Sequence, residues 1–150
     1  MLAKASLLIQ KIALLLVLTH TSGNLGLSRA AYKSAQQPSL TDQIYEKLDT
    51  YLEAPDLQTT AGFASWLSAQ KPTTKDAVLA KVISLSHLGY HSRQHGDLSK
   101  AIDFYSLAWH LYRVDALDGF DILESCLKPL GNLYTQTNAY TEAIEIHQRY

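Results

Sequence analysis

The most reactive side chain type in this sequence occurs once, as Cys126. A lone cysteine cannot form a disulfide within the chain, and a thiolate beside a base could act as a nucleophile. Cys126 directly precedes Leu127 and lies three residues before Pro129, at the start of a run of regularly spaced apolar residues. We therefore interpret it as a small packed side chain and predict no catalytic residue in this chain.

Three histidines, His87, His91 and His95, are spaced four residues apart and would form a stripe along a helix. Histidine pairs at this spacing can bind Zn²⁺, but the glutamate of a metalloprotease helix is missing between them. We interpret the stripe as structural or incidental, and predict neither a metal site nor a cofactor. The alternative is an enzyme that uses Cys126 or these histidines, which alkylation or a chelator would inactivate.

The composition narrows the classes of partner. The 150 residues include 13 basic and 14 acidic side chains, which gives a net charge of −1. Nucleic-acid binding calls for a clustered basic patch, and we predict no nucleic-acid partner. The length is sufficient for one domain with a hydrophobic core.

The region 84–150 contains one pattern of apolar and small residues twice, and each member of the second copy lies 42 positions after its partner in the first. The first copy comprises Leu85, Leu88, Gly89, Gly96, Asp97, Leu98, Ala101, Ile102, Tyr105 and Ala108. The second comprises Leu127, Leu130, Gly131, Asn138, Ala139, Tyr140, Ala143, Ile144, His147 and Tyr150. Self-similarity at a fixed period predicts a solenoid of stacked repeats.

Within each copy the apolar residues recur at helical spacing on both sides of a break. The breaks contain Gly96 and Asn138, residue types that tolerate the left-handed conformation of a helix C-cap. The sequence therefore predicts antiparallel helical hairpins. A single hairpin cannot bury its apolar face alone, so the hairpins must stack into an all-α solenoid.

This spacing resembles the tetratricopeptide repeat, in which a large apolar residue, Leu-Gly, a Gly or Asn turn, Ala, an aromatic residue and Ala follow in order. The second copy departs from that pattern at His147 and Tyr150, and the first has Ser92 where Tyr134 stands in the second. The usual period is about 34 residues. The eight additional residues here correspond to about two helical turns, one for each helix, which keeps the contact faces in phase.

The second copy also resembles the long repeats that precede CHAT domains, the caspase-like cysteine-protease modules. The resemblance rests on Cys-Leu-Lys-Pro-Leu-Gly-Asn-Leu-Tyr-Thr-Gln from Cys126 and on Tyr-Thr-Glu-Ala from Tyr140. It implies that this chain is the N-terminal part of a larger protein, with a peptidase domain beyond residue 150 as one alternative. No catalytic position of that family has a match here.

The resemblance to tetratricopeptide repeats also implies a groove lined by the first helix of each hairpin, which would hold a protein or peptide ligand. In chaperone-binding members a Lys and an Asn, here Lys128 and Asn132, hold a terminal carboxylate. The first copy has Ser86 and Tyr90 at those places, so the clamp lacks its matching residues. Lys128 would then be solvated and Asn132 structural. The full set of groove candidates is Ile83, Ser86, Tyr90, Arg93, Gln94, Ser125, Lys128, Asn132, Thr135 and Gln136.

Residues 1–30 have the features of a signal peptide: Lys4 and Lys11, a short apolar run from Ile12 to Leu18, and Ala30 at a small-residue cleavage site. This predicts export to the periplasm or the exterior. The alternative is an uncleaved membrane anchor, which Lys11 disfavours; we predict no stable span in the mature chain.

The remaining boundaries follow from composition and capping signals: Ser39 and Thr73 mark two helix starts, and a further helix is predicted from Thr60 to Gln70. We predict a linker at 31–38, an irregular helical hairpin at 39–72, a first repeat at 73–119 and a second, incomplete repeat at 120–150. Tyr150 falls in the middle of a predicted helix, so we expect either a continuing array or self-association through this end. The leading interpretation is a protein-interaction scaffold, with an oligomerisation module as a further alternative.

Overall fold

The computed structural model describes residues 37–150, and every regular element in that range is helical. The predicted all-α class is therefore confirmed. The predicted signal peptide and residues 31–36 of the predicted linker lie outside the described range. In chain order the elements are α3 (Leu40–Glu53), α4 (Leu57–Ala69), α5 (Lys75–Gln94), α6 (Leu98–Val114), the π-helical turn η1 (Leu123–Leu127), α7 (Lys128–Gln136) and α8 (Tyr140–His147).

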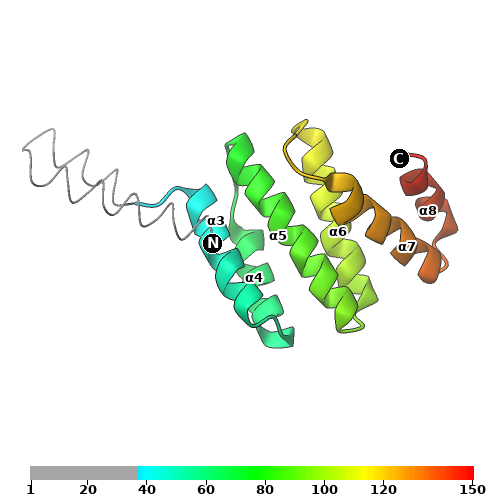
Figure 1. Ribbon diagram of the computed structural model, residues 1–150, viewed down its shortest axis with the longest axis horizontal. Coiled ribbons are helices and arrows are strands. Elements are labelled where there is room, and N and C mark those ends of the chain that lie inside the picture. The colour runs from blue at the N-terminus through cyan, green and yellow to red at the C-terminus, as the bar shows by residue number, and fades with distance from the viewer. Residues whose placement is uncertain (1–36) are drawn as a thin grey trace, which may run out of the picture.

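The helices pair into hairpins that lie side by side in chain order along the long axis of the molecule (Figure 1). Helices α3 and α4 form the first hairpin, and both pack against α5. Helix α6 returns along α5, and its other side contacts η1 and α7. Helix α8 packs against α7. The arrangement is compatible with the predicted helical solenoid.

The breaks predicted at Gly96 and Asn138 are tight turns with one residue in the left-handed conformation, because φ is 80° at Gly96 and 63° at Asn138. In each turn the next N–H donates to the carbonyl oxygen five residues back, at 2.9 Å for Asp97 and 2.8 Å for Ala139. This bond closes a Schellman motif at a helix C-terminus. The two motifs are 42 residues apart, so the period of the sequence pattern is also a period of the backbone.

Helix α4 begins earlier than the sequence pattern indicated. The pattern predicted a start at Thr60, whereas the first helical residue is Leu57. The reason is a capping box: the Thr59 N–H donates to Asp56 Oδ1 at 2.7 Å, and the Asp56 N–H donates to Thr59 Oγ1 at 2.8 Å. These bonds satisfy two backbone donors that a helix start otherwise leaves unpaired.

Two other helix starts were predicted from capping residues. Ser39 caps α3 as expected, with its hydroxyl accepting from the Asp42 N–H. For α5 the sequence indicated Thr73, but the cap is Thr74, whose Oγ1 accepts from the Ala77 N–H at 3.2 Å. Thr73 and Thr74 are adjacent and carry the same side chain, so either could supply the capping oxygen.

Helix α5 is the central helix of the fold, because it contacts both helices of the first hairpin and the whole length of α6. Its buried side chains therefore face more than one neighbour, which explains why its apolar residues are not confined to one stripe. Tyr105 and Ala108 of α6 are almost fully buried against it. No helix within residues 37–150 has the length and apolar character needed to cross a membrane.

Candidate functional site

A cleft of about 530 Å³ opens along one face of α5, between the end of α3 and the segment that leads into α7. Helix α5 contributes the largest share of its lining, from side chains that recur every three or four residues on one face. Tyr90 is half exposed in its wall. The lining residues are Leu52, Ser86, His87, Tyr90, His91, Arg93, Tyr105, Phe120, Glu124, Ser125 and Pro129.

The base of the cleft is built on the contact between α5 and α6. Gly89 of α5 has no side chain, and the ring of Tyr105 fills the space that a Cβ atom would need, 2.9 Å from the nearest ring carbon. The two helices therefore approach closely enough for Tyr105 to close the space between them. Burial raises the pKa of the Tyr105 phenol to about 12, so this group stays protonated at neutral pH.

The far wall is formed by the connection that follows α6. Ala116 and Gly119 both have positive φ, 48° and 77°, and the buried side chain of Leu117 anchors the segment between them. The chain then reaches Asp121, whose Oδ1 accepts from the Glu124 N–H at 3.2 Å and starts the next helix. This path brings Phe120 to the cleft.

Pro129 shapes the same wall. A proline inside a helix has no N–H to donate, and its ring clashes with the carbonyl four residues earlier. Here the preceding turn is widened to the π-helical η1, with the Lys128 N–H donating to the Leu123 carbonyl oxygen. A π turn is a common way to absorb such a disruption. The π turn ends at Leu127, two residues before Pro129, and its residues Glu124 and Ser125 line the cleft together with Pro129.

The charged groups of the cleft are few. Arg93 is exposed at its rim. Glu124 forms an ion pair with Lys128, and this contact raises the pKa of the Lys128 ammonium. Burial lowers the pKa values of His87 and His91, with a smaller contribution from His91 to the first and from His95 to the second, so the neutral form of both imidazoles is favoured. At neutral pH the cleft thus presents aromatic and apolar walls with one unpaired cation, Arg93, among its lining residues.

Two of the predicted groove residues, Tyr90 and Arg93, line this cleft, together with Ser86 and Ser125 from the wider set. Five others do not: Gln94, Lys128, Asn132, Thr135 and Gln136. Ile83 is also outside it.

Local contacts account for two of the residues that lie elsewhere. Lys128 turns to Glu124, and Thr135 Oγ1 donates to the Gly131 carbonyl oxygen at 3.0 Å. Asn132 is exposed on α7 and is not joined to Lys128 in one site. The groove candidates did not include the other lining residues, Leu52, His87, His91, Tyr105, Phe120, Glu124 and Pro129. For Glu124 a usable signal was present, the Asp121 capping residue three positions earlier.

Cys126 lies behind the cleft and is fully buried. Its thiol donates to the Tyr105 carbonyl oxygen at 3.2 Å. Burial raises the pKa of the thiol to about 12, so the nucleophilic thiolate is not populated at neutral pH. Cys126 is therefore a packed residue that links η1 to α6.

The histidine stripe is divided by its surroundings. His91 packs edge-on against two rings, Tyr51 at 5.5 Å and Tyr90 at 5.1 Å between centroids. His95 is exposed beyond the cleft. Within residues 37–150, no group of three histidine, cysteine or acidic side chains is arranged to hold a metal ion.

The arrangement as a whole is suited to non-covalent recognition by shape, aromatic contact and a guanidinium group. The Cys126 thiol is protonated and buried outside the cleft lining, and the Glu124 carboxylate in the lining is paired with Lys128. Comparisons of this chain with known protein families, with curated proteins and with solved structures find no match.

Proposed function

We propose that this chain is a protein-interaction scaffold of the tetratricopeptide kind, which binds a peptide segment of a partner in the cleft along α5. The observation that carries the proposal is the exposure of Tyr90, 50% accessible although it lies in the wall of a cleft with Leu52 and Phe120. An aromatic ring left open to solvent in a concave site is a typical anchor for a partner's side chain.

Arg93 adds a directional contact. It lies one helical turn from Tyr90 on the same helix, and both line the cleft. A guanidinium group can donate paired hydrogen bonds to a carboxylate or to backbone carbonyl oxygens of a bound peptide. Tyrosine and arginine are the residue types in which interface binding energy is most often concentrated.

The tetratricopeptide part of the proposal is supported by structural features that recur after 42 residues. Gly89 meets Tyr105, and Gly131 meets His147, in contacts of the same kind. The Schellman turns at Gly96 and Asn138 recur with the same spacing. The proposal therefore rests on equivalent contacts in both hairpins as well as on the sequence pattern.

The test is to select peptides against the full chain from a random peptide library and to measure their dissociation constants for four variants. Tyr90→Ala and Arg93→Ala remove the proposed anchors. Tyr140→Ala and Arg113→Ala are matched controls, because these exposed residues of the same types lie outside the cleft. We expect each cleft variant to weaken binding about tenfold, roughly 1.4 kcal/mol, and the controls to leave it unchanged. Peptides that bind all four variants equally would refute the proposal.

A second candidate function, self-association, is favoured by α8. Ile144 and Tyr140 on this helix are 57% and 58% exposed and lie four residues apart, so they form one exposed apolar strip. Sedimentation velocity of the full chain over a range of concentrations tests this. Association that Ile144→Lys abolishes supports the candidate, and a concentration-independent monomer excludes it.

A further inference from the structure

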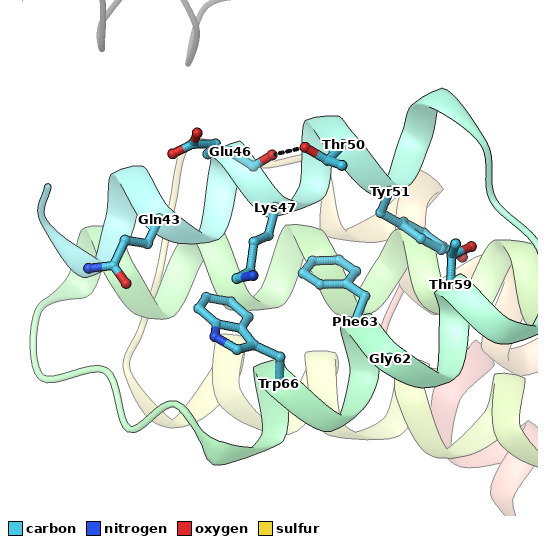
Figure 2. Close-up of a pocket in the computed structure, with 9 residues that line it drawn as sticks. All are labelled: Gln43, Glu46, Lys47, Thr50, Tyr51, Thr59, Gly62, Phe63 and Trp66. Atoms are coloured by element: carbon cyan, nitrogen blue, oxygen red, sulfur yellow. Dashed lines mark hydrogen bonds between the residues drawn. The ribbon is translucent and has the colours of Figure 1, made fainter.

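A second cleft lies between α3 and α4, on the side of the first hairpin turned away from the other helices (Figure 2). Its volume is about 510 Å³, within the range of small-molecule sites. It shares no lining residue with the cleft along α5. The residues that line it are Gln43, Glu46, Lys47, Thr50, Tyr51, Thr59, Gly62, Phe63 and Trp66.

One wall of this second cleft is aromatic. The rings of Phe63 and Trp66 are nearly parallel, with an interplanar angle of 16° and centroids 6.4 Å apart. Tyr51 continues the wall from α3, with its ring centroid 5.2 Å from that of Phe63. Tyr51 and Phe63 are buried, so Trp66 is the most accessible ring of this wall, on which an aromatic or aliphatic group can lie.

The cleft lining carries two charged side chains of opposite sign, Lys47 and Glu46. Lys47 extends from α3 toward α4, and its ammonium lies 4.9 Å from the centroid of the Trp66 ring. Figure 2 shows the Glu46 carboxylate pointing away from Lys47 and from the aromatic wall. The neighbouring hydroxyls are already engaged with the backbone, since Thr50 donates to the Glu46 carbonyl oxygen and Thr59 to that of Ala54, both at 3.1 Å.

We propose that the α3–α4 cleft is a binding site for a small amphipathic carboxylate. The apolar part of the ligand lies on Phe63 and Trp66, and its carboxylate pairs with the Lys47 ammonium beside Trp66. A charge-assisted hydrogen bond to a carboxylate is stronger than the contact of an exposed ammonium with a ring. This site does not depend on the proposed peptide-binding function, because the two clefts are separate.

Gly62 provides a way to close the cleft without disturbing the hairpin. A Cβ atom added at Gly62 meets no atom within 4 Å, and the residue lies in the cleft lining. A leucine there would extend into the space that the ligand occupies. Because glycine is a poor helix former, Gly62→Leu should also leave α4 at least as stable as before.

The test uses three probes with one apolar group and different head groups: phenylbutyrate, phenylbutanol and phenylbutylamine. Binding to the full chain is followed through the indole N–H resonance of Trp66, assigned by its loss in Trp66→Phe. We expect phenylbutyrate to shift this resonance and to bind at least fivefold more tightly than either other probe. Lys47→Met should remove that preference, Lys47→Arg should retain it, and Gly62→Leu should abolish binding.

Three outcomes would overturn the proposal. The first is equal affinity for the three probes, which would make the cleft a non-selective apolar surface. The second is phenylbutyrate binding that survives Gly62→Leu, which would place the ligand elsewhere. The third is the absence of any shift of the Trp66 resonance at millimolar phenylbutyrate.

Discussion

The ring of Tyr105 lies so close to Gly89 that a Cβ atom at that glycine would be 2.9 Å from the nearest ring carbon. The contact recurs 42 residues later, where a Cβ atom at Gly131 would be 2.8 Å from Cε1 of His147. The two rings differ in how far they can move away from the glycine. Tyr105 is 1% exposed and enclosed by the core, whereas His147 is exposed and can turn away.

This difference predicts unequal effects of alanine at the two glycines. For Gly89→Ala we expect a loss of about 1–2 kcal/mol in the free energy of unfolding, because overpacking at a fixed ring outweighs the gain in helix propensity. For Gly131→Ala we expect a change of less than about 0.5 kcal/mol, because the His147 ring can move. Urea denaturation measures both, with Gly62→Ala as a control that adds a methyl group in open space and should stabilise by about 0.5–1 kcal/mol. Equal losses at Gly89 and Gly131 would contradict this account.

Because the Cys126 thiol is buried, we expect the protein to lose stability in mild alkali. Burial raises the pKa of its thiol from 9.0 to about 12, so the folded state keeps the proton that the unfolded state releases. The contribution is complete below pH 9 and declines as the pH rises toward 12. Between about pH 8 and pH 10 we expect the free energy of unfolding to fall by about 1 kcal/mol from this group.

The control for that prediction is Cys126→Ala. The variant is less stable at every pH because it loses buried volume. The decline between about pH 8 and pH 10 should nevertheless be shallower than in the natural chain. A decline of the same size in both proteins would show that the thiol does not keep its proton in the folded state.

Because the His87 imidazole is partly buried, we expect the stability of the fold to fall in acid. Burial and the neighbouring His91 lower its pKa below 6.5, so the folded state favours the neutral imidazole. Stability from this group is present above pH 6.5 and is lost as the pH falls through its folded-state value. We expect the thermal midpoint to fall less in His87→Asn than in the natural chain between about pH 7 and pH 5. Equal decreases, or an imidazole pKa of 6.5 or above by NMR titration, would exclude the effect.

We expect replacement of the buried Ser92 hydroxyl to stabilise the protein. The side chain is 3% exposed, and its Oγ has no hydrogen-bond partner among the described residues. Ser84, on the same helix and fully buried, instead donates to the Ala80 carbonyl oxygen at 2.8 Å. Ser92→Ala should raise the free energy of unfolding by about 1 kcal/mol, since a buried unpaired hydroxyl is costly. Ser84→Ala is the matched control, and a gain of equal size there would show that helix propensity alone is responsible.

Much of the fold could be predicted because its signals are local. Apolar residues at helical spacing, together with Gly96 and Asn138 between two runs, require only the geometry of one hairpin to be understood. The first residues of the helices were predicted less accurately. Helix α4 is capped by Asp56 and begins before the predicted Thr60, because the capping box with Thr59 adds a turn that the apolar pattern does not show.

The candidate site was predictable only where a regular helix carries it. Tyr90 and Arg93 lie on the regular turns of α5, so their common face follows from the helical period. Lys128 and Asn132 were assigned from the resemblance to tetratricopeptide repeats, but the π turn before Pro129 interrupts the helical period, and neither residue lines the cleft.

The sequence by itself determined the all-helical class and the 42-residue repeat, because both follow from residue types and spacings that can be read along the chain. Only the tertiary structure decided which side chains form the two clefts. Leu52 at the end of α3 and Phe120 in the connection after α6 reach the first cleft from distant parts of the chain. Lys47 meets Trp66 in the second cleft only after α3 and α4 have packed. Such meetings depend on how whole helices pack and on the positive φ angles of one connection, which no local pattern specifies.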